Sequence, residues 1–340
     1  MKRTHASENN ARLAKIVEGF PRVTVAALAD LVADEFIFGE ISRVSREAPV
    51  LILKHRERTV LPGGGANAIY NLAALDVSVL PVGVVGDDET GYLLLEQFRH
   101  KHIPVGGIMR LKGRLTVTKS RILAGMAHTA RQQVVRLDRE PQEPLPRHIV
   151  RDLIAASRRY SRAADALLIS DYGYGAATPE MLAALRSRGQ LDSIPITLDS
   201  RYRMKQYAGG VTAATPNEPE VEETLGIRIG ANTSLLLKAG EALRRSMKLE
   251  SLVITRGRDG MVSFAAKHKP VQIPIHGSDQ VADVTGAGDT VIATYTAALA
   301  AGADPESAAR LANIAGGLVV MKRGTATVSR GELLRELGAN

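Results

Sequence analysis

Predicted helices and strands alternate along the sequence from about residue 146 onward. Short apolar runs such as "ADALLISDY" and "SLVITRG" follow segments with helical periodicity such as "RHIVRDLIAASRRY" and "SLLLKAGEALRRSM". A helical connection returns the chain to the end of the sheet at which the previous strand began, so such strands run parallel. A parallel sheet carries helices on both faces. We therefore predict an α/β fold, a three-layer α/β/α sandwich with a mostly parallel central sheet.

The first 145 residues add a second feature, which predicts a small β-sheet lid. The segments "FIFGEISRVSREAPVLILKHRERTVL", "RLTVTKSRILAG" and "ARQQVVRLDRE" mix apolar with charged residues, as strands with one exposed face do. The preceding run "RVTVAALADLVADEF" predicts a buried strand that leaves the main sheet near Asp30 and Asp34. We assign the lid to residues of about 36–60 and 108–138, and we interpret residues 1–340 as a single domain.

The composition removes several classes of protein. The 340 residues are 45% hydrophobic and 24% charged, as is typical of a folded globular chain. The absence of cysteine excludes disulfides and thiolate metal sites, so any metal here should be a hard ion with oxygen ligands. The net charge is +8, but Lys and Arg are spread along the chain, and only 8 Tyr and 5 Phe are available for base stacking. We expect no nucleic-acid partner.

The sequence also lacks the signals of a membrane or secreted protein. No apolar run is long enough to span a bilayer, and the N-terminus "MKRTHASENN" lacks the apolar core of a signal peptide. We therefore expect a cytoplasmic location and no membrane partner.

The segment "DVTGAGDTVIATYTAALAAG" places Gly286, Ala287, Gly288 and Asp289 at the start of an apolar helix. Helix starts offer unpaired N–H groups and the positive end of the helix dipole, and glycine lets a ligand approach them. Asp289 would then be a carboxylate beside an anion site, able to take a hydroxyl proton. The alternative is a tight turn in which Asp289 only stabilises the first helical turn.

Motifs of other enzyme classes are missing, and this favours phosphoryl transfer. The sequence has no G-x-x-x-x-G-K-[ST] loop, no dinucleotide fingerprint after the first strand and no G-x-S-x-G elbow. Polar residues do follow the predicted strands, namely Asp171, Asp199, Asn217 and Thr255. Ligands of open α/β sheets bind at this carboxyl edge, and phosphoryl transfer needs mainly positioning and charge neutralisation there.

Three further motifs each allow two interpretations. The glycines of "LPGGGANA" form either a ligand site or an ordinary loop before a helix. In "TPNEPE", Asn217 and Glu220 are suited to holding Mg²⁺ through water, but they would cap a helix equally well, and we slightly favour capping. The segment "TRGRDG" is either a nucleotide contact or a hairpin turn.

The order of these four motifs resembles that of the ribokinase-like (PfkB-type) sugar kinase family, over nearly the whole chain. "ADVTGAGDT" is similar to the most specific signature of the family, and "LPGGGANAIYNLAALDVSVLPVGVVGDDETG" resembles its N-terminal one. The resemblance implies a β lid, ATP, Mg²⁺ and a sugar hydroxyl as the nucleophile. It implies that Asp289 is the catalytic base and that the amides of Gly286, Ala287 and Gly288 form the anion hole.

The same resemblance implies the contacts of both substrates. Those of ATP would be Asn217, Glu220, Thr255, Gly257, Gly260 and Asn313, of which the first two would also organise the metal through water. Those of the sugar would be Asp34, Gly63, Gly64, Asn67 and Asp171. Dependence on a monovalent cation stays open.

Within the family, the segments "GEISRVSREAPV", "TVTKSRIL", "QQVVRLDRE", "LLISDYGYG" and "KRGTATVSRGEL" resemble kinases of D-glycero-D-manno-heptose 7-phosphate. This implies transfer to the anomeric hydroxyl, giving heptose 1,7-bisphosphate for lipopolysaccharide. A phosphorylated sugar needs cationic partners, which would be the lid residues Arg43, Lys119, Arg121 and Arg136. Alternatively, these are solvated charges that discourage pairing of the lid edges.

The chain departs from those heptose kinases at Ala29, at Tyr174 where they have lysine, and at Arg201 where they also have lysine. It ends after the kinase region, so we expect no fused nucleotidyltransferase domain. A kinase of another sugar, sugar phosphate or nucleoside is one alternative, and a non-catalytic nucleotide- or sugar-binding regulator is another. A regulator that had lost the reaction would be expected to have a damaged base or anion hole, and the Gly-Ala-Gly-Asp sequence is intact. Exposed lid strands predict a homodimer formed through the lid.

Overall fold

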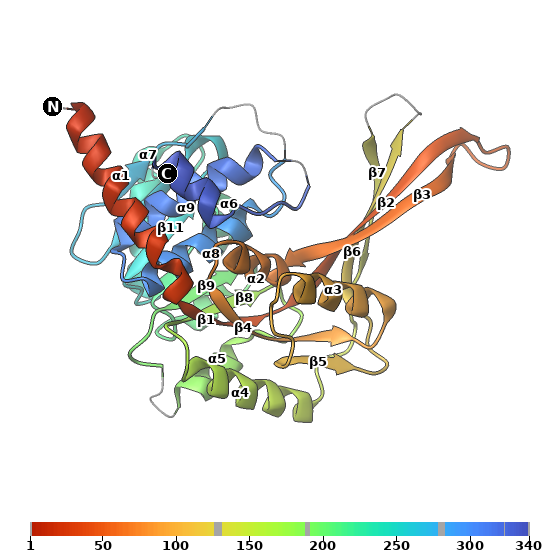
Figure 1. Cartoon of the computed structure of the whole chain (residues 1–340), viewed down its shortest axis with the longest axis horizontal. Coiled ribbons are helices and arrows are strands. Elements are labelled where there is room, and N and C mark those ends of the chain that lie inside the picture. The colour runs from red at the N-terminus through yellow and green to blue at the C-terminus, as the bar shows by residue number, and fades with distance from the viewer. Residues whose placement is uncertain (1, 126–130, 188–190, 278–282, 323, 339–340) are drawn as a thin grey trace.

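The computed structural model describes residues 2–125, 131–187, 191–277, 283–322 and 324–338. This part of the chain contains a nine-stranded sheet of order β13-β12-β11-β10-β9-β8-β1-β4-β5 and a four-stranded sheet of order β3-β2-β6-β7. The larger sheet lies inside the body, and the smaller one projects from it as a long arm (Figure 1).

Parallel pairing joins the larger sheet from β5 to β11, and β12 and β13 continue it in antiparallel pairing. Its strands are β1 Thr24–Ala29, β4 Ser78–Gly86, β5 Ile108–Leu111, β8 Ala166–Asp171, β9 Ile196–Ser200, β10 Ala213–Ala214, β11 Ser251–Thr255, β12 Met261–Ala265 and β13 Val271–Ile273. The predicted, mostly parallel sheet is confirmed.

Alternate residues of β1 face two separate cores, because side chains along a strand point to opposite faces of the sheet. Val25, Ala27 and Ala29 pack in one core with α1 Lys2–Gly19, α2 Gly65–Ala74, α3 Glu89–His100, α8 Ala287–Ala300, α9 Pro305–Val320 and α10 Arg330–Glu336. Ala26 and Leu28 pack in the other with α4 Arg147–Ser161, α5 Pro179–Arg186, α6 Glu218–Leu225 and α7 Thr233–Ser246. These layers confirm the α/β/α sandwich. The short 3₁₀ turns are Phe20–Arg22, Met204–Tyr207 and Gly257–Asp259.

The apolar run after Val23 divides at Asp30, with β1 before it in the large sheet and β2 after it in the lid. Asp30 is 1% exposed, and its carboxylate accepts backbone N–H groups of Tyr172, Tyr174 and Ala176 at 2.7–2.9 Å. Burial raises the pKa of Asp30 to about 6, although these three hydrogen bonds oppose the shift. Asp30 therefore ties the root of the lid to the loop that follows β8.

The lid strands are β2 Leu31–Val44, β3 Leu51–Gly64, β6 Val117–Gly125 and β7 Gln132–Arg139. β2 pairs antiparallel with β3 and parallel with β6, and β6 pairs antiparallel with β7. The predicted second lid segment needs a correction, because residues 108–111 pair with β4 at the edge of the large sheet. Residues 126–130 of the β6–β7 connection lie outside the described residues.

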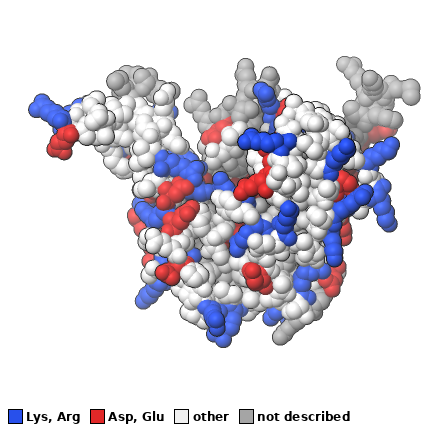
Figure 2. Space-filling model, turned by 180° about the vertical axis from the view of Figure 1, so that it is seen from behind, with Lys and Arg blue, Asp and Glu red and all other residues white. Residues whose placement is uncertain are grey.

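Charged side chains of both signs are interspersed over the face of the molecule shown in Figure 2. A single continuous basic surface is not visible on this face. Among the helices that the structure describes, none combines the length and the apolar character needed to cross a membrane.

Candidate active site

A cavity of about 480 Å³ lies at the carboxyl edge of the large sheet. Residues that follow β8, β9, β10 and β11 line it together with the start of α8, as expected for an open α/β sheet. The structure brings seven of the predicted site residues to this one cavity: Asn217, Glu220, Thr255, Gly257, Gly286, Gly288 and Asp289. Tyr172, Asp199 and Arg201 complete much of the remaining wall.

The start of α8 depends on Gly286, which has a φ of +77°. A Cβ atom on this residue would lie 2.5 Å from Nδ2 of Asn67, so only glycine fits between the helix and α2. Gly286 is the N-cap residue and has no side chain that could accept an amide of the first turn. The amide of Ala287 donates to the carbonyl of Val284 at 3.2 Å, which leaves Gly286 and Gly288 as the better candidates among the three predicted amides.

Both oxygens of the Asp289 carboxylate accept hydrogen bonds, and the residue is 5% exposed. The hydroxyl of Tyr172 donates to Oδ1 at 2.8 Å, and Nδ2 of Asn67 donates to Oδ2 at 2.9 Å. Burial, and then the negative charge of Asp199, raise the pKa of Asp289 to about 7, against the opposing effect of these two donors. Asp289 therefore exchanges protons near neutral pH.

A chain of hydrogen bonds fixes the orientation of the Asn67 amide. Nδ2 of Asn71 donates to Oδ1 of Asn67 at 3.1 Å, so Nδ2 of Asn67 must face Asp289. The hydroxyl of Thr290 donates in turn to Oδ1 of Asn71 at 2.9 Å. Asn71 and Thr290 were not among the residues predicted from sequence. The i, i+4 spacing of the two asparagines on one helix was the available signal.

Asn217 and Glu220 form a reciprocal cap at the start of α6, which is the interpretation that we slightly favoured from sequence. The Asn217 side chain accepts the amide of Glu220, and the Glu220 carboxylate accepts the amide of Asn217, both at 2.8 Å. The second carboxylate oxygen of Glu220 is not used by this cap. Burial raises the pKa of Glu220.

Three carboxylates, those of Asp199, Glu220 and Asp289, surround the same cavity. Burial and the charge of Glu220 raise the pKa of Asp199 to about 7. The described residues contain no group of three His, Asp or Glu side chains close enough to enclose an ion directly. Oxygen donors that repel one another fit a hard divalent cation held partly through water.

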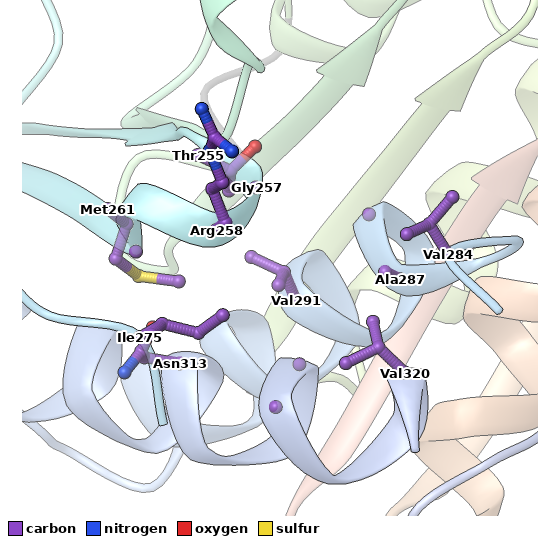
Figure 3. Close-up of a pocket in the computed structure, with 14 residues that line it drawn as sticks. Thr255, Gly257, Arg258, Met261, Ile275, Val284, Ala287, Val291, Asn313 and Val320 are labelled. Atoms are coloured by element: carbon purple, nitrogen blue, oxygen red, sulfur yellow. The ribbon is translucent and has the colours of Figure 1, made fainter. Parts of the chain in front are cut away.

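An apolar cavity of about 180 Å³, drawn in Figure 3, adjoins the polar one. The two cavities share Thr255, Gly257, Val284 and Gly288. Its walls include Met261, Ile275, Val291 and Val320, so it suits a flat apolar group. Gly260 and Asn313 also line it, and Nδ2 of Asn313 donates to the carbonyl of Pro274 at 2.8 Å.

The root of the lid gathers Asp34, Gly63 and Arg121. The Asp34 carboxylate is 4% exposed and forms an ion pair with Arg121. Gly63 lies against it, since a Cβ there would lie 2.5 Å from Oδ2 of Asp34. Gly64 has a φ of +50° and packs beside the ring of Tyr172. Among the described residues, the sequence-predicted group of Asp34, Gly63, Gly64 and Asn67 therefore lies between the lid and the base.

Some of the predicted lid cations lie near the root of the lid, and one lies far from it. The Lys119 ammonium lies 5.3 Å from the centre of the Tyr172 ring, and Arg136 forms an ion pair with Asp138. Burial, and then Arg201, lower the pKa of Lys119. Arg43 is different: it is exposed and lies nine residues along β2 from Asp34, roughly 30 Å at the usual strand rise. Arg43 therefore lies far along the lid from Asp34, and its contact with the sugar stays a prediction.

The structure also corrects the prediction for Asp171. Its carboxylate accepts hydrogen bonds from the amide of Gly173, the hydroxyls of Ser200 and Tyr207, and the guanidinium of Arg203. These donors occupy the lone pairs of both oxygens, and Asp171 is 1% exposed. Asp171 therefore holds the loop after β8 in place and leaves no acceptor for a sugar hydroxyl.

Two adjoining cavities, a carboxylate in the first turn of a helix that begins after a glycine, and a β lid are suited to phosphoryl transfer to an alcohol group. The sequence pattern described as pfkB family carbohydrate kinase matches residues 31–330, and the chain belongs to this family. It is a phosphotransferase that acts on a sugar hydroxyl. Kinases with the ribokinase-like fold in general use ATP and Mg²⁺.

Curated relatives named bifunctional protein HldE match most of this chain. Those of Trichlorobacter lovleyi, Geobacter metallireducens and Gluconobacter oxydans are 37%, 38% and 38% identical over 90%, 93% and 94% of this chain. The matches cover 61%, 63% and 64% of the relatives. The chain therefore spans about three-fifths of their length.

Solved structures of two sugar kinases share the fold. Ribokinase of Arabidopsis thaliana, complexed with ribose and ATP, matches with a TM-score of 0.70 and 20% identity over 94% of this chain and 99% of its own. Phosphofructokinase-2 of Escherichia coli matches with a TM-score of 0.73 and 18% identity over 93% and 98%. At these identities the likeness concerns the fold alone.

Proposed function

We propose that this kinase phosphorylates the anomeric hydroxyl of D-glycero-D-manno-heptose 7-phosphate with ATP. The product is heptose 1,7-bisphosphate, a precursor of lipopolysaccharide, and the reaction takes place in the cytoplasm. The name shared by the curated relatives supports this substrate.

One observation carries the proposal, a cluster of cations beside the base. Arg201 lines the polar cavity, and Arg201 and Arg136 both lie close enough to Lys119 to lower the pKa of its ammonium, after the effect of burial. Among the described residues, Asp34 and Asp138 are the carboxylates that raise the pKa of Lys119. Each already forms an ion pair with an arginine, Asp34 with Arg121 and Asp138 with Arg136. Lys119 therefore remains available for the phosphate of a sugar phosphate, and Arg201, which also faces Asp199 and Glu220, adds a second positive charge at the cavity.

The carboxylate of Asp289 takes the proton of the anomeric hydroxyl. The sugar oxygen then bonds to the γ-phosphorus of ATP while the bond between that phosphorus and the β–γ bridging oxygen breaks, and ADP leaves. A pKa of about 7 suits this base, because a base is most effective when its pKa lies near the working pH. The amides of Gly286 and Gly288 hold the phosphoryl oxygens at the positive end of α8.

The apolar cavity would take the adenine of ATP, with Val291 and Ile275 against its faces and Asn313 at its side. Thr255, Gly257 and Gly260 would follow the nucleotide toward the polar cavity. Glu220 and Asn217 would organise Mg²⁺ through water. When bound, the ion neutralises charge on the phosphates.

Arg201 and Tyr174 differ from the lysines of the heptose kinases that the sequence resembles, and their surroundings in the structure are known. Arg201 keeps a positive charge at the polar cavity, with a planar group in place of an ammonium. Tyr174 brings no charge, and its hydroxyl donates to Glu140 at 2.6 Å. The heptose phosphate would thus be held by Arg201 and Lys119 without a cation at Tyr174.

The test is ADP release with Mg-ATP and four acceptors: the heptose 7-phosphate, fructose 6-phosphate, ribose and adenosine. We expect rapid turnover of the heptose phosphate, a ³¹P signal from an anomeric phosphate in the product, and loss of turnover in Asp289→Asn. Asp152→Asn, which changes an exposed acid on α4, is the matched control. Preference for another acceptor would overturn the proposed substrate. Normal turnover by Asp289→Asn would overturn the proposed mechanism.

We further propose that two chains form a homodimer through their lids. Val134, Val135 and Leu137 on the edge strand β7 are 43%, 51% and 58% exposed, which is unusual for apolar residues of a sheet. Pairing of lids would cover them. Light scattering at micromolar concentration should give twice the mass of the chain, and Leu137→Lys should shift it toward one chain. A single-chain mass for the unaltered protein would contradict the dimer.

A further inference from the structure

Tyr172 contacts both the lid and the predicted base, and the sequence analysis did not single it out. It directly follows β8, and its hydroxyl donates to Oδ1 of Asp289 at 2.8 Å. The ammonium of Lys119, from lid strand β6, lies 5.3 Å from the centre of its ring. A Cβ on Gly64 would lie 3.3 Å from the ring edge, so this neighbour also confines the ring.

The backbone at Tyr172 is fixed independently of any ligand. Its amide donates to Oδ2 of Asp30 at 2.9 Å, and the amide of Gly173 donates to Oδ1 of Asp171 at 2.9 Å. Arg203 in turn binds the Asp171 carboxylate, with an Nη2–Oδ1 distance of 2.5 Å. Buried carboxylates thus hold both sides of the Tyr172 peptide, and the phenol is directed at Asp289 before a sugar arrives.

Two donors hold the Asp289 carboxylate from opposite ends, Tyr172 at Oδ1 and Asn67 at Oδ2. Each oxygen keeps a further lone pair, so the carboxylate can still accept a proton from a substrate. Two fixed donors restrict rotation of the carboxylate plane. They also favour its ionised form over its protonated form, because both donate to the charge.

We propose that Tyr172 is a positioning residue for phosphoryl transfer, which with Asn67 fixes the carboxylate of Asp289 and keeps it ready to accept the sugar proton. This inference rests on the proposed role of Asp289 as the base. Tyr172 acts through Asp289 and is not itself a catalytic residue.

The charges around Asp289 set the sign of the effect. Asp199 near the end of β9 and Asp34 on β2 both raise its pKa, in addition to burial. The positive groups on this side are Lys119, over the Tyr172 ring, and Arg201, in the same cavity. Without the phenol hydroxyl, burial and both acids would still raise the pKa of Asp289, and only the hydrogen bond from Asn67 would still lower it. The pKa of Asp289 should therefore rise above about 7.

The experiment is Tyr172→Phe, with kcat and kcat/KM measured from pH 5.5 to 9 on a sugar that the unaltered enzyme accepts. We expect the acidic limb of the profile to move up by about one pH unit, which corresponds to about a fivefold loss at pH 7. At pH 9 Asp289 is ionised in both enzymes, so the part of the loss in kcat that comes from protonation of the base should disappear. A loss of about tenfold in kcat, caused by misorientation of the carboxylate, should remain. KM for ATP should change by less than about twofold, because the phenol binds the base.

Tyr174→Phe is the matched control, since it removes a phenol hydroxyl from the same loop, where the partner is Glu140. Its acidic limb should coincide with that of the unaltered enzyme. Replacement of Tyr172 by 3-fluorotyrosine tests the same point in a nearly isosteric side chain and does not depend on how the Phe variant folds. Its phenol is the stronger donor, so the limb should move to lower pH.

Unmoved limbs in both Tyr172 variants would overturn the inference. A shift of equal size in Tyr174→Phe would also overturn it, because the effect would then belong to the loop and not to the contact with Asp289. A different result would show that the proposed mechanism is wrong. That result is normal turnover by Asp289→Asn, and it does not depend on the behaviour of the Tyr172 variants.

Discussion

The main chain of Gly286 packs directly against the side-chain amide of Asn67, although 219 residues separate them in sequence. Nδ2 of Asn67 lies 3.5 Å from the carbonyl oxygen of Gly286 and 2.9 Å from Oδ2 of Asp289. Helices α2 and α8 are thus joined at their N-terminal turns, at the point where the predicted base lies. The absence of a side chain at Gly286 permits this approach.

Gly286→Ala should therefore damage both stability and activity. Its Cβ would lie 2.5 Å from Nδ2 of Asn67, and its φ of +77° is unfavourable for alanine. We expect a loss of ~1–3 kcal/mol in the free energy of unfolding. Because displacement of Asn67 frees one oxygen of Asp289, kcat should also fall about a hundredfold. Urea denaturation and steady-state kinetics measure the two effects.

Gly288→Ala is the matched control for stability. A Cβ at Gly288 would meet no atom within 4 Å, and the residue lies inside the helix. Alanine there should leave the protein as stable or raise its stability by up to ~1 kcal/mol. Equal destabilisation by both alanines would show that the contact with Asn67 is not the cause.

The residues that sequence reasoning found share one property, since each stands at an element boundary that short-range patterns define. Asp289 begins an apolar helix, Asn217 caps α6, and Thr255 ends a buried strand. Periodicity locates such boundaries, and parallel topology then places the strand ends on one edge. The cavity there could therefore be predicted before its geometry was known.

The residues that sequence reasoning missed or misplaced depend on distances across the fold. Tyr172 reaches Asp289 over 117 positions, and no local pattern links them. Its neighbour Asp171 also follows a strand, yet Arg203 and Tyr207 occupy its carboxylate. Arg43 belongs to the predicted lid, but the length of β2 carries it away from the site. The positions and partners of these three side chains therefore depend on long-range pairing and on strand length, which local sequence patterns do not reveal.

Asp199 should reduce stability above neutral pH. Its pKa is raised to about 7, first by burial and then by the charge of Glu220, so the folded protein binds a proton more tightly than the unfolded chain. The free energy of unfolding should consequently fall as the pH rises from about 4 to 7. Asp199→Asn removes the charge and should be more stable than the unaltered protein by ~1–3 kcal/mol at pH 8.

Urea denaturation at pH 4.5 and at pH 8 tests this sign. The difference should be clearly smaller at pH 4.5, and it should vanish only below about pH 3.8, where Asp199 is protonated in both the folded and the unfolded chain. Asp152→Asn, which alters an exposed acid on α4, should change stability by less than about 0.5 kcal/mol at either pH. An Asp199→Asn variant no more stable than the unaltered protein at pH 8 would contradict the argument. Its turnover should fall, as is common when a destabilised active site is relieved.

Arg58 connects the lid to the body of the enzyme. Its Nε lies 2.6 Å from Oε1 of Glu35 on β2, and its Nη1 lies 2.8 Å from Oε2 of Glu89 on α3. Glu35 is 4% exposed and also accepts a hydrogen bond from Ser120. Burial raises the pKa of Glu35, but the hydrogen bonds from Ser120 and Arg58 prevail and hold it below its usual range. Arg58 is thus in direct contact with a buried charge and compensates it, with a smaller contribution from Arg139.

Arg58→Met should lower the free energy of unfolding by ~2–3 kcal/mol at pH 7, because it leaves Glu35 charged and poorly compensated. The loss should shrink as the pH falls below 4.5, where Glu35 takes up a proton in the unfolded chain first. Arg56→Met is the control two residues away, since Arg56 pairs with Glu40 in solvent and should matter little. Adding Glu35→Gln to Arg58→Met should restore part of the loss, and a strictly additive double variant would show that the two side chains are not coupled.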